Sequence, residues 1–496
     1  MKPLLTREAA RRFDRRIIDA GVPGLVLMEN AGRGAADLFL RRFAGRLDHV
    51  VVVGGTGQNG GDAWVVARRL LTHGVRPKVF LAGAREKVSG DAKVNLEALD
   101  ALDLDVTELG EGDLAPLDGA LAHATAIVEG LFGTGLDRPI EGWRRALVER
   151  LDGAAAPLFA LDLPSGIDAD TGAVLGVALH AELTATFAAH KRGLWQTPGR
   201  GHAGETVCVD IGVPGPTGRD GLLELGDAAR LLSRRALAAH KGTAGHVVVV
   251  AGSPGKSGAA LLSGHGAMRA GAGLVTLAPR GEAREALELR VHELMTMAIP
   301  DAPLELAEGK DAAVIGPGLG LDDEGKALAV ALAEGLAVPA VLDADALTAL
   351  AEAGPERLHD APPRVLTPHP GEAGRLLGVT SAEVQADRFA AAKKLVELTG
   401  QTVVLKGAGT VIARPGELAV CPLGTPALGV AGTGDVLAGA IGAALAGGLE
   451  PFDAARAMVL LHARAGERAS RSDRGLLARE VADALPDALE EARRRC

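Results

Sequence analysis

Asp435 is the only charged side chain between residues 418 and 449, in the segment LAVCPLGTPALGVAGTGDVLAGAIGAALAGGL. A carboxylate among apolar neighbours is costly to desolvate, so it is expected either to be paired or to be kept for chemistry. Gly432, Thr433 and Gly434 precede it as a turn, and the Ala-rich run after it predicts a buried helix. A glycine turn that opens a helix directs free backbone N–H groups at one point, which favours a phosphate. An acid beside that point could take the proton from a hydroxyl that attacks phosphorus.

Two other interpretations compete with this catalytic one. Asp435 could be an N-cap that only closes the helix, because Asp is among the favoured N-cap residues. A membrane span is disfavoured, since glycines, Pro422, Pro426 and the central acid interrupt the run.

Three further motifs could belong to the same site. Lys406 to Thr410 could hold phosphate through backbone N–H groups and one ammonium, or could be a hairpin turn with a surface lysine. The run GPGLG (316–320) would let a ligand approach the backbone, or is only a tight loop. His369 lies between prolines, where a lone histidine can be structural or catalytic. Together with Asp435, these motifs describe phosphoryl transfer from a nucleotide to a small hydroxylated substrate.

The composition argues against several classes of protein. Of the 496 residues, 47% are hydrophobic and 23% charged, which is typical of a soluble globular protein. The net charge of −10 and the absence of Tyr argue against a nucleic-acid binder. Cys208, Cys421 and Cys496 show no CxxC spacing, so we expect no disulfide framework or zinc site, and a cytoplasmic location. The N-terminus has no apolar segment, so no secretory signal is expected, and no run suits a membrane span.

Short β-branched runs alternate with helical patterns along the chain. Alternation of this kind predicts an α/β fold with doubly wound parallel sheets, whose ligands bind at the carboxyl ends of the strands. The predicted strand regions are 49–55, 78–83, 124–135, 157–166, 183–191 and 206–212, and then 246–253, 272–279, 311–320, 338–347, 363–372 and 401–413.

The segment GVPGPTGRDG (212–221) is the expected boundary between two domains, because it is dense in Gly and Pro and the pattern restarts after it. We therefore expect an N-terminal Rossmann-like domain over 1–215, a linker over 216–225 and a second α/β domain over 226–496. HVVVVAGSPGKSGAA (246–260) is similar to HVVVVGGTGQNGGD (49–62), which indicates two domains of related construction, each with its own site.

The glycine loop of the first domain satisfies GxGxxG between a strand and a helix, but the ribose-binding acid expected about twenty residues later is absent. An ordinary NAD dehydrogenase is therefore disfavoured. Asn59 and Asp62 in this loop, and Glu129, Asp162 and Ser165 after later strands, could instead form an oxygen-rich site for a hard cation or a hydroxylated ligand. The alternative is that these residues cap their helices independently.

Four motifs of this half resemble the NAD(P)H-hydrate epimerase family, known as the YjeF N-terminal domain. They are LMENAG (27–32), QNGGD (58–62), GLFGTGL (130–136) and DLPSGIDADTG (162–172), within a resemblance that covers roughly residues 5–213. Members of the family interconvert the R and S forms of NAD(P)H hydrated on the nicotinamide ring.

The resemblance implies a potassium ion held by Asn59, Ser165 and the acid ending the third strand, which is Glu129 here where the family usually has Asp. Because epimerisation at carbon needs acid–base help, Asp162 is the catalytic candidate. The resemblance implies contact with the hydrated cofactor by Gln58, Asn59, Gly60, Gly61, Asp62, Gly133, Thr134, Gly135, Leu136, Asp137, Arg138, Pro139 and Asp162.

The second half is similar to the ribokinase-like superfamily and, more closely, to the NAD(P)H-hydrate dehydratase family, the YjeF C-terminal domain. The matching motifs span roughly residues 226–490 and are HKGTAGHVVVVAGS, GAGLVT, GPGLG, LTPHPGEA, KGAGT and GTGDVLAG. Members dehydrate the S hydrate with a nucleotide, generally ADP in bacteria, and Mg²⁺ is expected for its phosphates. The resemblance implies hydrate contacts at Ala259, Gly318, His369 and Asp435, and nucleotide contacts at Lys406, Gly407, Ala408, Gly409, Thr410 and Gly434.

The sequence therefore predicts a bifunctional cytoplasmic repair enzyme, with an epimerase in the first half and an ADP-dependent dehydratase in the second. The expected partners are the hydrated cofactor, ADP and further copies of the chain in a homo-oligomer, with no nucleic acid or membrane. The alternative is a ribokinase-like vitamin-precursor kinase fused to a non-catalytic Rossmann-like binding module.

Overall fold

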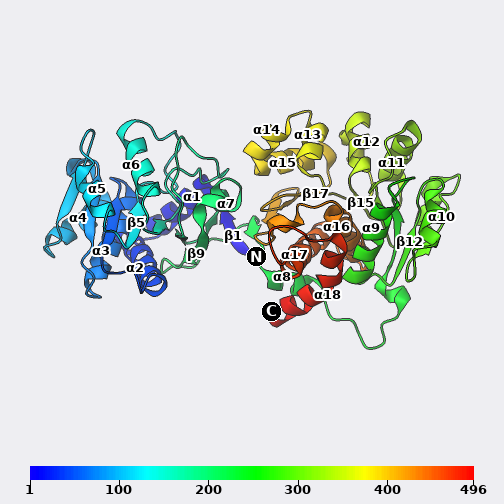
Figure 1. Ribbon diagram of the computed structural model, residues 1–496, viewed down its shortest axis with the longest axis horizontal. Helices are drawn as coiled ribbons and strands as arrows, with labels where there is room; N and C mark the ends of the chain where they lie inside the picture. Colours follow the sequence, from blue (N-terminus) through cyan, green and yellow to red (C-terminus); the bar gives the residue numbers. More distant parts are fainter. The chain divides into compact units, whose positions relative to one another are not determined.

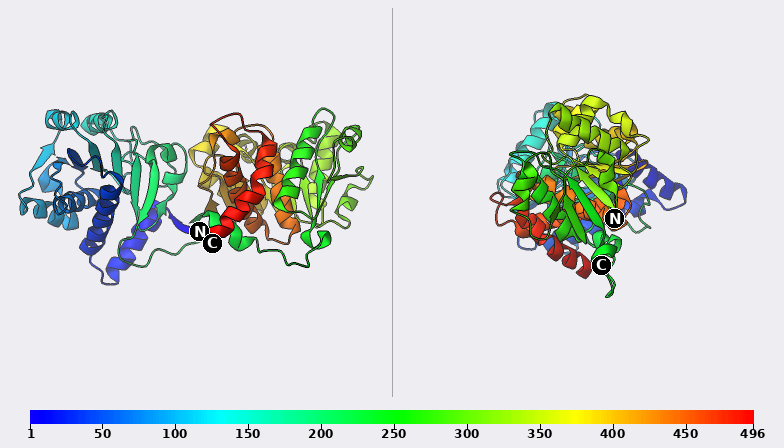
Figure 2. Two further views of the ribbon diagram at one scale, coloured as in Figure 1. Left: turned by 60° about the horizontal axis from the view of Figure 1, so that its bottom comes forward. Right: turned by 90° about the vertical axis from the view of Figure 1, so that its right-hand side faces the viewer.

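The computed structural model describes all residues, 1–496, and divides into two compact units, Lys2–Gly218 and Arg219–Cys496, with Met1 grouped with the second. Each unit is a twisted sheet with helices on both faces (Figure 1, Figure 2). Strand β10 (Gly221–Leu222) lies inside the segment 216–225 that was expected to be a linker, and it pairs in parallel with β19 (Glu417–Val420). The chain therefore belongs to the second sheet from Gly221 onward.

The sheet of the N-terminal unit is seven-stranded and wholly parallel, in the order β4-β3-β2-β5-β6-β7-β9. The direction of winding reverses between β2 and β5, and such a switch point is where α/β sheets bind ligands. A short parallel pair, β1 and β8, lies outside this sheet. The strands are β1 (Lys2–Leu5), β2 (Val50–Gly54), β3 (Lys78–Ala82), β4 (Val106–Leu109), β5 (Ala126–Gly130), β6 (Leu158–Leu161), β7 (Leu183–Phe187), β8 (His190–Lys191) and β9 (Glu205–Val209).

Alternate residues of these strands pack against opposite helical layers, as the pleat of a strand requires. Val50 and Val52 belong to the core beneath α2 (Gly24–Arg42), α3 (Gln58–Leu71) and α4 (Gly90–Asp100). Val51 and Val53 belong to the core beneath α5 (Ala115–Leu121) and α6 (Gly142–Asp152). Strand β2 is therefore buried on both faces, and this packing fixes the direction of its carboxyl end. Helices α1 (Arg7–Asp19) and α7 (Gly199–Ala203) complete the unit.

The sheet of the C-terminal unit runs β13-β12-β11-β14-β15-β16-β17-β18-β19-β10. It is parallel from β13 to β17, β18 is antiparallel to both of its neighbours, and the winding reverses between β11 and β14. Its remaining strands are β11 (His246–Val250), β12 (Leu274–Leu277), β13 (Met295–Thr296), β14 (Ala312–Ile315), β15 (Ala340–Leu342), β16 (Arg364–Leu366), β17 (Thr402–Leu405) and β18 (Val411–Arg414).

The helices of this unit form two layers that Figure 1 shows on opposite sides of the sheet. One layer contains α11 (Asp323–Gly335), α12 (Asp345–Ala353), α13 (Pro370–Leu377), α14 (Ser381–Ala386) and α15 (Arg388–Thr399). The other contains α8 (Leu225–Leu231), α9 (Ser257–Ala270), α16 (Thr433–Ala446), α17 (Pro451–Ala469) and α18 (Ala478–Arg494), with α10 (Ala283–Glu288) near the β12 edge.

Helix α16 is buried on nearly every side, as its Ala-rich sequence predicts. Glycines let it approach α9 closely: a Cβ on Gly439 would lie 1.9 Å from the Ser263 carbonyl oxygen, and one on Gly266 would lie 2.3 Å from that of Val436. This close packing fixes the first turn of α16 relative to the sheet, and Asp435 lies in that turn.

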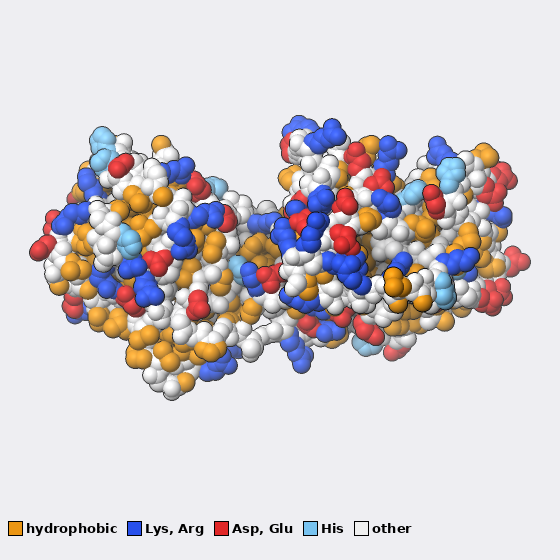
Figure 3. Space-filling model, turned by 90° about the horizontal axis from the view of Figure 1, so that it is seen from below, with side chains coloured by type: hydrophobic (Ala, Val, Ile, Leu, Met, Phe, Trp, Pro, Cys, Tyr) orange, Lys and Arg blue, Asp and Glu red, His pale blue; other side chains and the backbone are white.

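None of the helices is both long and apolar enough to cross a membrane. On the face drawn in Figure 3, Lys and Arg side chains are mixed with Asp and Glu.

Candidate active sites

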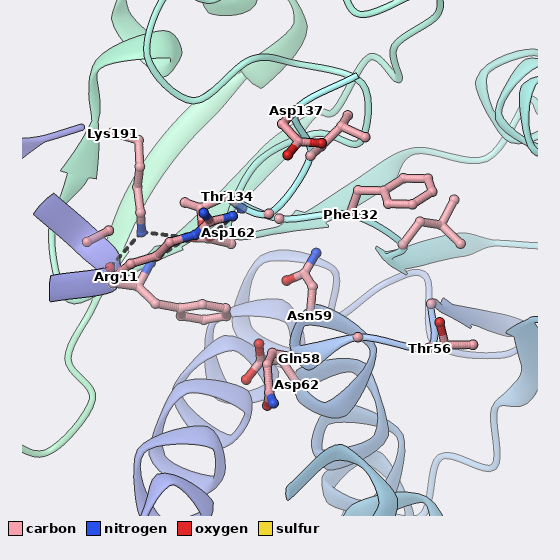
Figure 4. Close-up of a pocket in the computed structure, with 18 of the residues that line it drawn as sticks. Arg11, Thr56, Gln58, Asn59, Asp62, Phe132, Thr134, Asp137, Asp162 and Lys191 are labelled. Carbon is pink, nitrogen blue, oxygen red and sulfur yellow. Dashed lines mark hydrogen bonds and ion pairs between the residues drawn. The ribbon is translucent and has the colours of Figure 1, made fainter. Parts of the chain in front are cut away.

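A cavity of about 940 Å³ opens where β2, β5 and β6 end in the N-terminal unit. Three predicted segments meet there: the loop after β2, the loop after β5 and the residue that follows β6 (Figure 4). The predicted residues that line the cavity are Gln58, Asn59, Asp62, Gly133, Thr134, Gly135, Leu136, Asp137, Arg138, Pro139 and Asp162.

Gly60 and Gly61 do not line this cavity, although the sequence predicted that they contact the substrate. They are tightly packed instead: a Cβ on Gly60 would lie 1.9 Å from the Gly55 carbonyl oxygen, and one on Gly61 would lie 2.5 Å from the sulfur of Met28. Their small size lets α3 begin directly beneath the glycine loop, and this places Asn59 and Asp62 at the cavity wall.

Asp162 is held in a conformation that few non-glycine residues adopt, with φ of 64°. Its Oδ1 lies 2.5 Å from Lys191 Nζ, and its Oδ2 accepts a hydrogen bond of 3.3 Å from the backbone N–H of Thr134. Lys191 Nζ also donates to Thr186 Oγ1 and to the Phe187 carbonyl oxygen, at 3.1 and 2.8 Å. Lys191 therefore holds the Asp162 carboxyl in place from the side of β8, through a charge-assisted contact.

Two further carboxyls face the same cavity, Asp14 from α1 and Asp62 from α3. Burial, reinforced by repulsion from Asp162 and Asp14 and only partly offset by Lys191, raises the pKa of Asp62 well above its usual range. The pKa of Asp14 is also raised, chiefly by burial, with Lys191 lowering it and Asp162 raising it. The cavity therefore combines an ion-paired carboxylate with carboxyls that retain protons more strongly.

Of the residues that the resemblance assigns to potassium, Asn59 lines this cavity, whereas Glu129 and Ser165 are fully buried. Glu129 is fully buried and accepts hydrogen bonds from Ser165 N at 2.9 Å, Ser165 Oγ at 2.7 Å and Leu131 N at 3.2 Å. Burial raises the pKa of Glu129 to about 7, although the bonds from Ser165 and Leu131 oppose that rise. Asn59 donates from Nδ2 to the Leu161 carbonyl oxygen at 3.0 Å, while its Oδ1 is buried without a partner.

In the C-terminal unit, the structure excludes the interpretation of Asp435 as an N-cap. Gly432 is the N-cap of α16, with φ of 92°, and Asp435 lies in the first turn of the helix. The Asp435 carboxylate has no hydrogen bond or ion pair within the protein. Burial, together with repulsion from Asp343 and Asp345 and despite attraction by Lys406, raises its pKa to about 7. A general base works best with a pKa near the ambient pH.

Lys406 follows β17 and lies beside this turn. The loop from Lys406 to Thr410 does connect two antiparallel strands, β17 and β18, so it is a hairpin turn. The lysine is not a free surface group, however, because its Nζ lies 2.7 Å from Asp343 Oδ1 and its side chain is 20% exposed. A Cβ on Gly434 would lie 3.4 Å from the same Nζ. The ammonium therefore lies next to the free backbone end of α16.

The GPGLG loop after β14 is forced into its shape by its glycines. Gly316, Gly318 and Gly320 have φ of 119°, 60° and 102°, and a Cβ on Gly316 would lie 2.0 Å from the Asp343 carbonyl oxygen. A Cβ on Gly318 would lie 3.1 Å from that of Ala259 on α9, so these two predicted hydrate contacts are neighbours. Ala259 follows β11 and Gly318 follows β14, the two strands between which the winding reverses.

His369 has a structural role that the sequence left open. Its Nδ1 accepts hydrogen bonds from Gly371 N and Glu372 N at 3.0 and 3.3 Å, so it caps α13. Its Nε2 lies 3.4 Å from Glu372 Oε1, and its side chain is 52% exposed. The imidazole can thus both hold the helix end and present an edge to a ligand. Burial raises the pKa of Glu372 to about 7, against attraction by Lys406.

Sequence reasoning missed Lys191, Asp14 and Asp343. Asp343 directly follows β15, and the rule that identified Asp162 would have found it too. Lys191 stood within a predicted strand region that the structure divides into β7 and β8. No local signal marks Asp14, whose helix reaches the cavity only through the tertiary fold.

The comparisons with known proteins match both halves of the chain. Residues 24–193 match the family model described as YjeF-related protein N-terminus, and residues 247–487 match the one described as NAD(P)H-hydrate dehydratase. Relatives named bifunctional NAD(P)H-hydrate repair enzyme Nnr include one from Moorella thermoacetica, 40% identical over 94% of this chain and 92% of that protein. One from Escherichia coli is 36% identical over 96% of this chain and 92% of its own.

The chain belongs to the family of bifunctional NAD(P)H-hydrate repair enzymes.

Membership of this repair family confirms the resemblance of both halves. It also favours the bifunctional interpretation over the vitamin-precursor kinase with a non-catalytic module, because relatives that span both halves are named as repair enzymes. Among solved structures, an ADP/ATP-dependent NAD(P)H-hydrate dehydratase from Bacillus subtilis, co-crystallised with ATP/Mg²⁺, is 34% identical. The match covers 53% of this chain and 94% of the Bacillus subtilis chain, with a TM-score of 0.47.

Proposed function

We propose that the N-terminal unit interconverts the R and S hydrates of NAD(P)H and that the C-terminal unit dehydrates the S hydrate with ADP, giving NAD(P)H, AMP and phosphate. The observation that carries this proposal is Asp435, a partly buried carboxylate without a partner in the first turn of α16, beside Lys406. An acid, a cation and free backbone N–H groups are the requirements for transferring a phosphoryl group to a hydroxyl.

Asp435 removes the proton from the ring hydroxyl of the hydrate as that oxygen attacks the terminal phosphorus of ADP. The bond from phosphorus to the bridging oxygen breaks, and AMP leaves with that electron pair. The ring nitrogen then expels the phosphate, and loss of a ring proton restores NAD(P)H. Lys406 and the α16 N-terminus stabilise the charge on the transferred group.

Lys406 is suited to this role because its charge is secured by its neighbours. Burial alone would lower its pKa, but Asp343 and Glu372 outweigh burial and raise it. The residues from Lys406 to Thr410, with Gly434, would hold the nucleotide, while Ala259, Gly318 and His369 would contact the hydrate beside Asp435.

We also propose Mg²⁺ as the partner of the nucleotide phosphates, where it would neutralise charge. This ion typically uses one or two protein carboxylates together with phosphate oxygens. Asp345, whose side chain is 16% exposed and lies 3.3 Å from Lys256, is a carboxylate at this rim that could serve.

The N-terminal unit has the oxygen donors for a potassium ion. The Oδ1 of Asn59 is a buried acceptor without a donor, and the Glu129 carboxylate and Ser165 hydroxyl add further oxygen atoms. Hard monovalent cations prefer such an oxygen set, and the ion would offset the burial of the Glu129 charge. We propose that Asn59, Glu129 and Ser165 hold the ion, and that it fixes the loops around Asp162.

The location of the protein and its oligomeric state are two further proposals. We propose a cytoplasmic location, with which the three free cysteines agree. We also propose that the enzyme is a homo-oligomer.

A single pair of incubations tests the proposed function. The purified chain is given a mixture of R and S hydrates, first without nucleotide and then with ADP and Mg²⁺. We expect re-equilibration of R and S in the first incubation, and full recovery of reduced-cofactor absorbance with stoichiometric AMP in the second. A stable phosphorylated product, or recovery limited to the S fraction, would contradict the proposal.

A further inference from the structure

Two carboxyls face the N-terminal cavity in opposite environments. Asp162, at the end of β6, is paired with Lys191, whose side chain is only 4% exposed. Asp62, in α3, is 8% exposed, and its carboxyl makes no hydrogen bond or ion pair with the protein. Figure 4 shows them on different elements of the same pocket, with Lys191 close to Asp162 and away from Asp62. One carboxyl therefore has an ammonium partner, and the other has none.

The groups that act on Asp62 favour its neutral form. Its burial comes first, then repulsion from Asp162 and from Asp14 on α1, against attraction by the more distant charge of Lys191. When neighbouring carboxyls are pushed toward different protonation states, they suit opposite roles in acid–base catalysis.

We propose that Asp62 and Asp162 are an acid–base pair for epimerisation, with Asp62 as proton donor, Asp162 as proton acceptor and Lys191 as the residue that positions Asp162. This inference rests on the proposed epimerase function and adds the division of labour within that site.

The pair fits the chemistry of a hydrate whose hydroxyl-bearing carbon adjoins the ring nitrogen. Asp62 gives its proton to the departing hydroxyl, and the carbon–oxygen bond breaks to release water. The nitrogen lone pair forms a carbon–nitrogen double bond. Water then adds to the opposite face, its oxygen forms the new carbon–oxygen bond, and the double-bond pair returns to nitrogen. Asp162 accepts the proton that this water loses. No oxidant or co-substrate is consumed.

Each turnover leaves the proton on Asp162 and the negative charge on Asp62. The site is then prepared for the reverse conversion, which suits an enzyme that must run in both directions. The contact of 2.5 Å between Lys191 Nζ and Asp162 Oδ1 holds the Asp162 carboxyl in one position for both directions. The other buried acid, Glu129, is bound by Ser165 and Leu131 and is not available for this exchange.

The test compares Asp62→Asn, Asp162→Asn and, as a matched control, Glu141→Gln, an exposed carboxyl at the rim of the same cavity. Epimerisation of purified R hydrate is followed without nucleotide, after subtraction of the spontaneous rate. We expect kcat to fall at least about a hundredfold in both Asn variants, as loss of a general acid or base does. The control is expected to stay near wild type. Dehydration of S hydrate with ADP by the same samples reports whether the chain is folded.

The pH profile separates chemistry from binding. Wild-type kcat should fall at high pH as Asp62 loses its proton. The residual rate of Asp62→Asn should lack this alkaline fall, and that of Asp162→Asn should retain it. A rise in KM, with kcat and the alkaline fall both retained in Asp62→Asn, would overturn the proposal and leave binding roles only.

Lys191 and the transferred oxygen give two more readouts. Lys191→Met should lower kcat with little change in KM, because Asp162 loses the ammonium that holds its Oδ1, and Lys191→Arg should restore kcat in part. In heavy-oxygen water, each epimerisation should place one solvent oxygen in the hydrate. Retention of the original oxygen would refute the proposed step. A wild-type chain that does not epimerise would refute the proposed function instead.

Discussion

The two sites occupy the same place in related sheets but differ in how they treat charge. In the N-terminal unit the titratable groups surround a cavity of about 940 Å³, and Asp162 is paired with Lys191 within the protein. In the C-terminal unit the lysine is paired with Asp343, and the acid at the helix start, Asp435, has no partner. The proposed epimerisation exchanges protons and water and needs no co-substrate, whereas dehydration needs a nucleotide. The second site therefore presents backbone N–H groups and leaves an acid uncompensated.

The variant Asp435→Asn tests this difference between the two sites most directly. Dehydration should fall by about 10²–10⁴-fold, the usual contribution of a general base, while epimerisation in the same chain persists. The amide keeps the shape of the side chain, so nucleotide binding should remain. Turnover of S hydrate with ADP near the wild-type rate would exclude Asp435 as the base.

Removing the cation, with Lys406→Met, tests the other half of that site. Loss of a charge-assisted contact to phosphate, worth about 1.5–3 kcal/mol, should raise the KM for ADP roughly ten- to a hundredfold. The buried Asp343 would also lose its ion-pair partner, so thermal unfolding of the C-terminal unit should begin at a lower temperature. Lys406→Arg is the control that keeps the charge. An unchanged KM in the Met variant would place the phosphates elsewhere.

The potassium proposal is tested by Asn59→Ala, which removes the unpaired Oδ1. Replacing K⁺ by Na⁺ should lower the unfolding temperature of the wild-type N-terminal unit, because an ion bound only by the folded state stabilises it. The Ala variant should lose most of that difference, and about tenfold more K⁺ should be needed for half-maximal epimerisation. Equal responses in the two proteins would remove Asn59 from the ion site.

The rate of dehydration should depend on pH through Asp435, whose pKa is raised to about 7 chiefly by burial and by repulsion from Asp343. The base is the ionised form, so the rate should fall as pH drops below about 7. The stability of the C-terminal unit should change with pH in the opposite sense. Because the folded state binds the Asp435 proton more tightly than the unfolded chain does, stability is lost as pH rises toward and through about 7. Asp435→Asn should remove that loss and unfold at a higher temperature than wild type at pH 8. A flat rate profile from pH 6 to 8 would contradict this assignment.

The course of the two sheets could be predicted from the sequence because each buried strand is a short apolar run, and these runs alternate with helical patterns. Asp162 could be identified because it directly follows such a run, and Asp343 follows one in the same way. The ion pairs could not be predicted. Lys191 reaches Asp162 from β8, and Asp14 reaches the cavity from the first helix of the unit, so both contacts depend on the path of the chain between strands. The close packing of Gly60 and Gly61 beneath the glycine loop was also beyond local patterns, because it depends on Gly55 and Met28 in the folded chain.

The smallest expected effect concerns Ala431, which directly precedes Gly432. Ala431 is exposed and is not among the non-glycine residues with positive φ, so its backbone needs no glycine. Ala431→Gly should leave dehydration within about twofold and lower stability by about 0.4–1 kcal/mol, through greater freedom of the unfolded chain. Gly432→Ala is the contrasting variant, because Gly432 has φ of 92° and its Cβ would lie 2.5 Å from Leu262 Cδ1. It should displace the first turn of α16 and reduce the rate far more. If both substitutions had equal effects on the rate, the start of α16 would not be the rigid feature that holds Asp435 in place.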